Sequence, residues 1–321
     1  MPVLNHSTYQ PSLLFKNKHF NTVYRTLFNK YAIPFDRQRL ELADGDFIDL
    51  DISSVNADKV VIAIHGLEGS SASTYILSLT QILNQHHFDV VAMNLRGCSG
   101  EPNRLLSSYH SGKTEDLEAV IQYIEQQYHY KEIHLVGYSL GGNLSLKYMG
   151  EKGKKARVQS AVGVSVPCDL KTTAIQMNAW SNRLYLNRFL KTLVEKSFQK
   201  LTMFPDSFLT EEAIASIKNF KDFDDLYTAP AHGFTDAEDY WRKSSCKQFI
   251  PKINKPTLLI TSLDDPFFGD ACYPFTEAEE NDSFFMEATN YGGHVGFGKY
   301  FDVLKNTWCE HRILSFLTTQ Q

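Results

Sequence analysis

The pentapeptide GYSLG at 137–141 constrains the fold of this chain more than any other feature. It follows the apolar run Ile133–Val136, which predicts a buried strand, and precedes the helix-compatible stretch 142–149. At so sharp a strand-to-helix turn, neighbouring backbone leaves no room for side chains at the flanking glycines, and the serine hydroxyl is pushed out above the sheet. The pattern therefore predicts an exposed, nucleophilic Ser139.

A serine hydroxyl is a poor nucleophile at neutral pH, so Ser139 needs a base to accept its proton and an acid to orient that base. Downstream, His294 lies in the glycine-rich run YGGHVGF at 291–297, just after the apolar stretch 284–288. Asp264 and Asp265 follow a strand-like run at 256–261. We favour Asp265 as the acid because the proline after it fixes the backbone just past the strand end, and Asp264 is the alternative.

A third element is expected to stabilise the negative charge of a tetrahedral intermediate. The apolar run Val60–Ile64 ends in the loop HGLEGS at 65–70. We expect the backbone N–H groups of Leu67 and Leu140 to point at this charge, and donors of this kind contribute roughly 3 kcal/mol each. His65 is expected to hold the loop, and not to serve as the base.

The remaining apolar pattern alternates between strand-like and helix-like segments. Residues 39–52 alternate apolar and polar side chains on both sides of Asp44-Gly45, which predicts a hairpin of two edge strands. Strands are expected at 60–64, 90–95, 133–136 and 161–166, with helices at 72–85, at 114–127 and at the C-terminal end, from about 301 to 317. Continuous apolar strands of this kind predict an α/β fold, a mostly parallel central sheet with helices on both faces.

Between Val166 and Pro256 the strand pattern stops for about ninety residues, which is too long for a loop. We expect an inserted helical cap over Ser139, with an amphipathic helix around Leu186–Val194 that packs on the core or on partner helices. The many aromatic residues of this insertion favour an acyl chain as ligand. The predicted division is an N-terminal arm packed on the core (1–38), the first part of the core (39–168), the cap (169–252) and the second part of the core (253–321).

Composition excludes several classes of function. The chain has 321 residues and a net charge of −5, so no basic field recruits nucleic acid. Its five cysteines are scattered and no HExxH motif is present, so neither a metal nor a cofactor is expected. A polar N-terminus and the absence of a run of about twenty apolar residues predict a cytoplasmic protein without a transmembrane segment, whose cap could contact a membrane peripherally. The sequence does not indicate an oligomeric state.

Together these motifs resemble the YheT-like branch of the α/β-hydrolase superfamily, the AB hydrolase type 4 family, which includes esterases, lipases and medium-chain ester synthases. The resemblance covers nearly the whole chain and rests on the blocks DGDFIDLD (44–51), HGLEGS (65–70), NLRGCSG (94–100), YHSG (109–112), GYSLGGN (137–143), DDPF (264–267) and GGHVGF (292–297). It implies an α/β-hydrolase fold and carries the family's catalytic serine, aspartate and histidine onto Ser139, Asp265 and His294. At His110 the HxxxxD signature of some acyltransferases is imperfect, so we assign that histidine no catalytic role.

These observations predict a serine carboxylesterase that hydrolyses short- or medium-chain acyl esters through an acyl-enzyme intermediate. Its expected partner is a small-molecule acyl ester. Two alternatives stay within acyl chemistry: acyl transfer to an alcohol, and lipase-like hydrolysis of monoacylglycerol. A non-catalytic binding module is disfavoured, because such proteins usually lack a member of the triad and all three residues are present here.

Overall fold

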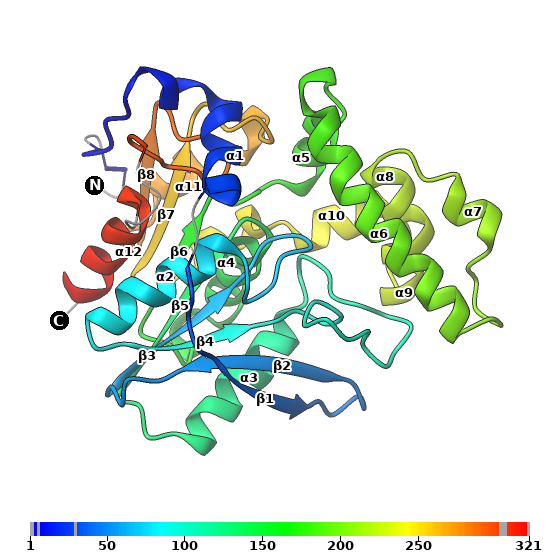
Figure 1. The fold of residues 1–321 in the computed structure, drawn as a ribbon, viewed down its shortest axis with the longest axis horizontal. Helices are drawn as coiled ribbons and strands as arrows, with labels where there is room; N and C mark the ends of the chain where they lie inside the picture. The colour runs from blue at the N-terminus through cyan, green and yellow to red at the C-terminus, as the bar shows by residue number, and fades with distance from the viewer. Residues whose placement is uncertain (1–2, 5–6, 29–30, 302–306, 320–321) are drawn as a thin grey trace.

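The centre of the molecule is a mixed sheet of eight strands, in a computed structural model that describes residues 3–4, 7–28, 31–301 and 307–319. The strand order is β1-β2-β4-β3-β5-β6-β7-β8 (Figure 1). Strands β3 to β8 run parallel to one another, and β1 and β2 pair antiparallel at one end. The strands are β1 (Asp36–Glu41), β2 (Phe47–Ser53), β3 (Lys59–Ile64), β4 (Asp89–Met93), β5 (Glu132–Tyr138), β6 (Ser160–Val164), β7 (Thr257–Ser262) and β8 (Phe284–Thr289). The predicted fold class is confirmed.

The predicted hairpin is present, but only β1 lies at the edge of the sheet. Strand β2 also pairs with β4, and all of its residues are buried. The acidic residues that gave β2 the alternation of an edge strand are neutralised inside the fold, because Asp49 and Asp51 each pair with an arginine of β1 at 2.7 Å. The expectation of two edge strands is therefore wrong for β2.

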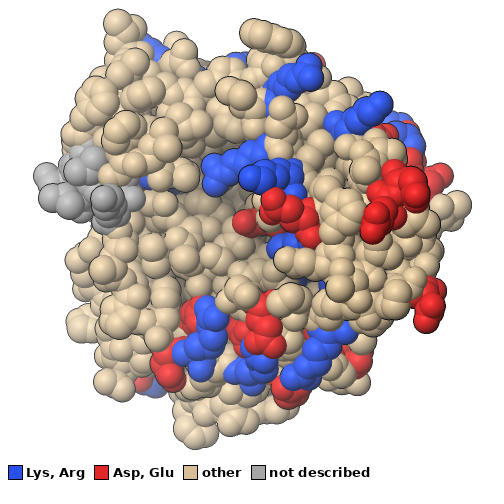
Figure 2. All heavy atoms as spheres, turned by 45° about the vertical axis from the view of Figure 1, so that its right-hand side comes forward, with Lys and Arg blue, Asp and Glu red and all other residues tan. Residues whose placement is uncertain are grey.

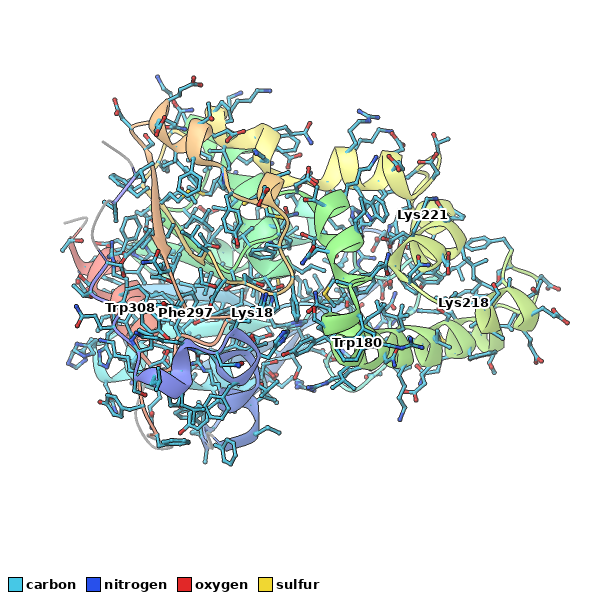
Figure 3. The ribbon with its side chains drawn as sticks, turned by 90° about the horizontal axis from the view of Figure 1, so that it is seen from above. Lys18, Trp180, Lys218, Lys221, Phe297 and Trp308 are labelled. Atoms are coloured by element: carbon cyan, nitrogen blue, oxygen red, sulfur yellow. The ribbon has the colours of Figure 1, made fainter. Side chains whose placement is uncertain are left out.

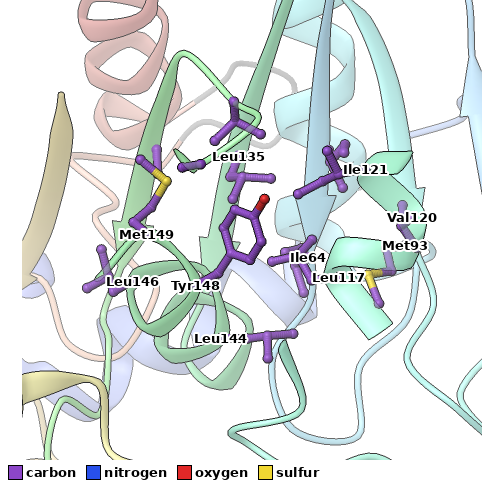
Figure 4. Close-up of a cluster of buried hydrophobic side chains, with 14 of the residues drawn as sticks. Ile64, Met93, Leu117, Val120, Ile121, Leu135, Leu144, Leu146, Tyr148 and Met149 are labelled. Atoms are coloured by element: carbon purple, nitrogen blue, oxygen red, sulfur yellow. The ribbon is translucent and has the colours of Figure 1, made fainter. Parts of the chain in front are cut away.

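Helices cover both faces of the sheet and enclose two separate apolar cores. On one face α2 (Thr74–Gln85) and α12 (Trp308–Thr319) pack on alternate strand residues such as Val61 and Ala63. On the other face α3 (Thr114–Gln127), α4 (Leu140–Lys152) and α11 (Phe275–Glu279) pack on residues such as Ile62 and Ile64. Figure 4 shows part of this second core around Tyr148.

The predicted helices at 72–85 and 114–127 are confirmed as α2 and α3. The last helix begins at Trp308, and residues 302–306 of its predicted range lie outside the described residues.

The predicted helical insertion occupies the segment between β6 and β7. It projects to one side of the sheet, where Figure 3 labels Trp180, Lys218 and Lys221. Its elements are α5 (Leu170–Met177), η3 (Trp180–Asn182), α6 (Arg183–Met203), α7 (Glu211–Ala215), α8 (Phe220–Phe223), the π-helical turn η4 (Asp224–Thr228), α9 (Ala229–His232), α10 (Ala237–Ser244) and η5 (Cys246–Lys252). The boundaries 169–252 stay a prediction, and η5 packs closely on α4 of the core: a Cβ at Gly150 would lie 2.2 Å from the Phe249 carbonyl oxygen.

Short elements complete the described chain. Before β1 lie η1 (Leu13–Lys16) and α1 (Lys18–Phe28), and the other short helices are η2 (Gly153–Lys155) and η6 (Asp270–Cys272). In Figure 1, α1 lies near the end of the sheet formed by β7 and β8, far from β1 in space. Among the described residues, no helix is both long enough and apolar enough to cross a bilayer.

Candidate active site

Ser139 occupies the tight turn between β5 and α4. Its φ of 51° lies in the left-handed region, which an L-residue adopts only when its surroundings enforce it. The flanking glycines explain how the turn closes: a Cβ at Gly137 would lie 2.2 Å from the Gly141 carbonyl oxygen, and a Cβ at Gly141 would lie 2.4 Å from the Ile64 carbonyl oxygen. Both obstacles are backbone atoms that cannot move aside, so the two glycines are sterically required.

The structure brings Ser139, His294 and Asp265 together. The His294 Nε2 atom lies 2.9 Å from Ser139 Oγ, and its Nδ1 atom lies 2.8 Å from Asp265 Oδ2. The Asp265 side chain is fully buried, and its Oδ1 accepts a hydrogen bond from the Phe267 N–H at 2.9 Å. Both carboxylate oxygens thus have a donor, and the His294 ring is oriented with one nitrogen toward the serine.

Asp264, the alternative acid, has a different contact. Its Oδ1 accepts a hydrogen bond from the backbone N–H of Gly293 at 2.9 Å, so it holds the histidine loop and does not reach the imidazole. Burial raises the pKa of the Asp264 carboxyl, and the Gly293 N–H acts in the opposite direction. The geometry favours Asp265 as the partner of His294.

Helix α1, near the start of the chain, holds the His294 loop from outside. The His294 N–H donates to Thr22 Oγ1 at 2.9 Å. The loop and α1 approach each other too closely for any side chain at Gly293, where a Cβ would lie 2.4 Å from the Lys18 carbonyl oxygen. From the other side, the Val295 N–H donates to Ser165 Oγ at 3.0 Å. No sequence pattern indicates these contacts, because Thr22 lies in a polar segment of weak periodicity.

The loop after β3 lies directly against Ser139. A Cβ at Gly66 would be 3.1 Å from the Ser139 Cβ atom, and Leu67 lines the same cavity as Ser139 and His294. Leu140 lines this cavity too, and it is the first residue of α4, where backbone N–H groups have no partner within the helix. The two predicted oxyanion residues thus border one cavity with the serine.

His65 holds this loop, as expected. Its Nδ1 lies 2.7 Å from the Gly66 carbonyl oxygen, and its Nε2 accepts the Leu95 N–H at 3.1 Å. The ring therefore carries its proton on Nδ1. Burial lowers the pKa of His65 to about 4, so the ring is neutral at pH 7 and ties β3 to the segment after β4.

A cavity of about 360 Å³ lies between the cap and the core, above Ser139. Its walls are mostly apolar and aromatic, with the cap contributing Met177, Phe189, Leu193, Phe223, Tyr227 and Trp241. Two polar side chains stand out in the wall. Burial raises the pKa of Asp224 to about 7 and lowers the pKa of His110 well below its usual value. His110 thus borders the cavity although it lies outside the Ser139 hydrogen-bond chain.

The charged side chains near the cap are mixed in sign. Figure 2 shows Lys and Arg next to Asp and Glu on the face that carries the cap. Exposed pairs such as Lys221 with Asp225 and Arg242 with Asp239 lie at 2.5 Å. Solvent screens such pairs, so they contribute little to stability. Within the described ranges, no group of three His, Cys, Asp or Glu residues is placed to hold a metal ion.

Comparison with known proteins agrees with this architecture. Residues 59–297 match the family model described as the alpha/beta hydrolase fold. This chain belongs to the α/β-hydrolase family. It is 36% identical over 312 residues to YheT of Escherichia coli (strain K12), described as a proposed esterase, which covers 95% of this chain and 91% of that protein. The match confirms the YheT-like branch of the family.

Other relatives carry names from lipid and ester chemistry. The chain is 32% identical to medium-chain fatty acid ethyl ester synthase/esterase 2 of Saccharomyces cerevisiae, over 81% of this chain and 62% of that one. It is 27% identical to phospholipase ABHD3 of Homo sapiens, over 90% of this chain and 73% of that protein. Among solved structures, the Pyrococcus furiosus esterase Pf2001 aligns with a TM-score of 0.59 at 16% identity, over 91% of this hydrolase and 98% of that chain. At such low identity this likeness shows the fold alone.

Proposed function

We propose that this α/β-hydrolase is a serine carboxylesterase acting on short- or medium-chain acyl esters. The single observation that carries the proposal is the continuous chain of contacts from Ser139 Oγ through the His294 imidazole to Asp265 Oδ2, at 2.9 and 2.8 Å. Nucleophile, base and orienting acid within hydrogen-bond reach form the arrangement that activates a serine.

The proposed reaction has two half-reactions. With Asp265 accepting the Nδ1 proton of His294, Nε2 is free to take the proton of the Ser139 hydroxyl as its oxygen bonds to the ester carbonyl carbon. The imidazolium then gives that proton to the departing alkoxide oxygen as the C–O bond breaks, which leaves an acyl-serine. Water repeats the sequence, and the products are a carboxylic acid and the free enzyme.

The backbone N–H groups of Leu67 and Leu140 are proposed to receive the negative charge on the carbonyl oxygen. Each donor of this kind typically contributes about 10²- to 10³-fold in rate. The observation behind this proposal is that both residues border the cavity that contains Ser139. Leu67 does so from the loop after β3, and Leu140 from the start of α4. Neither role depends on the leucine side chain.

The cavity supports a small acyl group. Its volume of about 360 Å³ lies at the lower end of the range of about 300–1,000 Å³ for ligand pockets. The apolar cap wall fits an alkyl chain and offers little to a sugar or a nucleotide. We therefore expect hydrolysis of p-nitrophenyl esters to be fastest at short or medium chain length and to fall for a sixteen-carbon chain. A rate that rises steadily to sixteen carbons would contradict this size limit.

Substitution of the serine tests the mechanism. Ser139→Ala should abolish hydrolysis of p-nitrophenyl butyrate and labelling by a fluorophosphonate probe, because the variant lacks the hydroxyl that is proposed to form the acyl-enzyme. The matched control is Ser216→Ala, at an exposed position of the cap, which should keep wild-type activity and labelling. Persistent labelling of the Ser139→Ala variant would exclude this nucleophile.

A second candidate function is acyl transfer to an alcohol, which the name of the yeast ester synthase/esterase favours. The acyl-serine would then be resolved by an alcohol in place of water. Product analysis with ethanol or glycerol added to the assay separates the two reactions: ethyl esters or acylglycerols indicate transfer, and free acid alone indicates hydrolysis. The same assay run with monoacylglycerol as substrate tests the activity named for another yeast relative, monoacylglycerol lipase.

A further inference from the structure

The loop that carries Leu67 contains a residue in a conformation that favours glycine. The Gly69 N–H donates to the Gly66 carbonyl oxygen at 3.0 Å, which closes a four-residue turn with Leu67 and Glu68 at its centre. Glu68 has a φ of 54°. At the third position of such a turn, positive φ is usually supplied by Gly or Asn, because an L-residue with a longer side chain is strained there. Contacts outside the turn must therefore hold Glu68.

The Glu68 side chain makes those contacts. The Tyr109 hydroxyl donates to Glu68 Oε1 at 2.6 Å and accepts the backbone N–H of the same residue at 3.1 Å. Burial raises the pKa of Tyr109 well above its usual value, so the hydroxyl stays protonated as a donor. Lys196 Nζ lies 2.9 Å from Oε2 and 3.0 Å from Oε1, and only 5% of the Glu68 side chain is exposed. One carboxylate thus binds a core tyrosine and a cap lysine together.

Lys196 makes helix α6 of the cap part of this arrangement. One helical turn further along α6, Lys200 Nζ donates to the carbonyl oxygens of Asn103 at 2.7 Å and Leu105 at 2.5 Å. Two lysines on one face of α6 therefore fasten the cap to two loops of the core. The first of these loops is the turn from Gly66 to Gly69, which contains Glu68 and packs against Ser139 through Gly66.

We propose that Glu68 is a positioning residue for the oxyanion hole, and that Lys196 makes the position of the cap decide whether that hole is formed. The inference rests on the proposed function, because it concerns the Leu67 N–H. With Lys196 in place, Glu68 stays in its left-handed conformation and the Leu67 N–H faces the cavity. When α6 moves away, the turn loses the ion pair that offsets its strain, and the donor turns aside.

This arrangement predicts an effect on turnover more than on substrate binding. A misplaced oxyanion donor stabilises the transition state less, because the carbonyl oxygen is charged there. The apolar contacts that bind the acyl chain remain. We therefore expect kcat to fall with KM nearly unchanged. A lysine that merely stabilised the cap would change thermal stability without this selective loss of kcat.

The decisive comparison uses two substitutions that both remove the carboxylate and differ only in their tolerance of positive φ. Glu68→Ala should lower kcat for p-nitrophenyl butyrate by about tenfold, the factor that corresponds to the left-handed strain of an L-residue. Glu68→Gly should stay within about threefold of wild type, because glycine adopts this φ without strain. Equal kcat values for the two variants would overturn the inference.

Lys196 is tested in the same way. Lys196→Met should lower kcat by about tenfold, Lys196→Arg should restore most of it, and Lys196→Met in the Glu68→Gly background should have no further effect. Lys191→Met is the matched control, since this lysine lies on the same helix with 77% of its side chain exposed. If Glu68→Ala does not fold, the comparison of Lys196→Met with Lys191→Met decides, and equal kcat values refute the inference. A wild-type protein that hydrolyses no ester would refute the proposed function itself.

Discussion

The buried Asp224 allows a quantitative test of the structure. Its two carboxylate oxygens accept hydrogen bonds from Thr228 Oγ1 and Trp241 Nε1, each at 2.7 Å, and within the described part of the chain no cation pairs with it. Burial raises its pKa from 3.8 to about 7, although both hydrogen bonds act in the opposite direction. The native state therefore keeps a proton that the unfolded chain releases between these two pH values.

The sign of the effect follows from this difference. The contribution of Asp224 to stability is complete below about pH 4 and is lost as pH rises through about 7. Well below the native pKa each pH unit costs about 1.4 kcal/mol, and the slope flattens near pH 7, so the loss is about 2 kcal/mol between pH 5 and pH 7 and about 3 kcal/mol by pH 8. Asp224→Asn does not titrate. We expect the free energy of unfolding of the variant to rise relative to wild type by about 3 kcal/mol between pH 5 and pH 8.

Urea unfolding followed by tryptophan fluorescence at pH 5, 6, 7 and 8 measures this difference. Asparagine fits the site because the Thr228 hydroxyl can accept as well as donate, so the amide can donate to it while its oxygen accepts from Trp241. Asp206→Asn, at an exposed position of the same insertion, is the matched control. A difference between Asp224→Asn and wild type that is constant over the four pH values would refute the assignment of a buried, protonated carboxyl.

Two further predictions concern the loops that form the site. Gly141→Ala should prevent correct folding, because the new Cβ would lie 2.4 Å from the Ile64 carbonyl oxygen. Gly233 has positive φ but open space around it, so Gly233→Ala should lower the free energy of unfolding by only about 1 kcal/mol. Comparable urea midpoints for the two variants would contradict the steric argument. Thr22→Val should lower stability by about 1 kcal/mol and kcat/KM several-fold, because the His294 N–H loses its acceptor. Thr202→Val, whose hydroxyl bonds only within the exposed part of α6, should change neither value, and a similar loss in both variants would show that the effect is not specific to the histidine loop.

The sequence supplied the elements whose cause is local. Continuous apolar runs predicted the parallel strands, and the glycines around Ser139 predicted the turn, because strand burial and backbone crowding are both visible in neighbouring residues. The pairing of Asp265 with His294 was also predicted, although proline alone gave little reason to prefer it over Asp264. That choice needed coordinates, since the two carboxyl groups are adjacent in sequence and bind neighbouring groups of one loop, the Gly293 N–H and the His294 ring.

Contacts between distant segments could not be predicted where no motif marks both partners. The ion pair of Lys196 with Glu68 joins residues 128 positions apart, and nothing in the local pattern of either segment indicates it. The inner position of β2 was missed for a related reason, since its acidic residues are neutralised by the neighbouring strand. Tertiary packing decides such cases, and local propensity does not.

The contact of α1 with the His294 loop joins residues 272 positions apart, Thr22 and His294. During synthesis, a growing chain can expose the serine turn once residue 141 leaves the ribosome, yet the proposed proton acceptor and its acid partner are translated more than a hundred residues later. For the proposed mechanism, the nascent protein therefore stays catalytically inactive until residue 294 has left the ribosome. A stall that kept His294 inside the exit tunnel would leave Ser139 without its proposed base, however well the residues before it had folded.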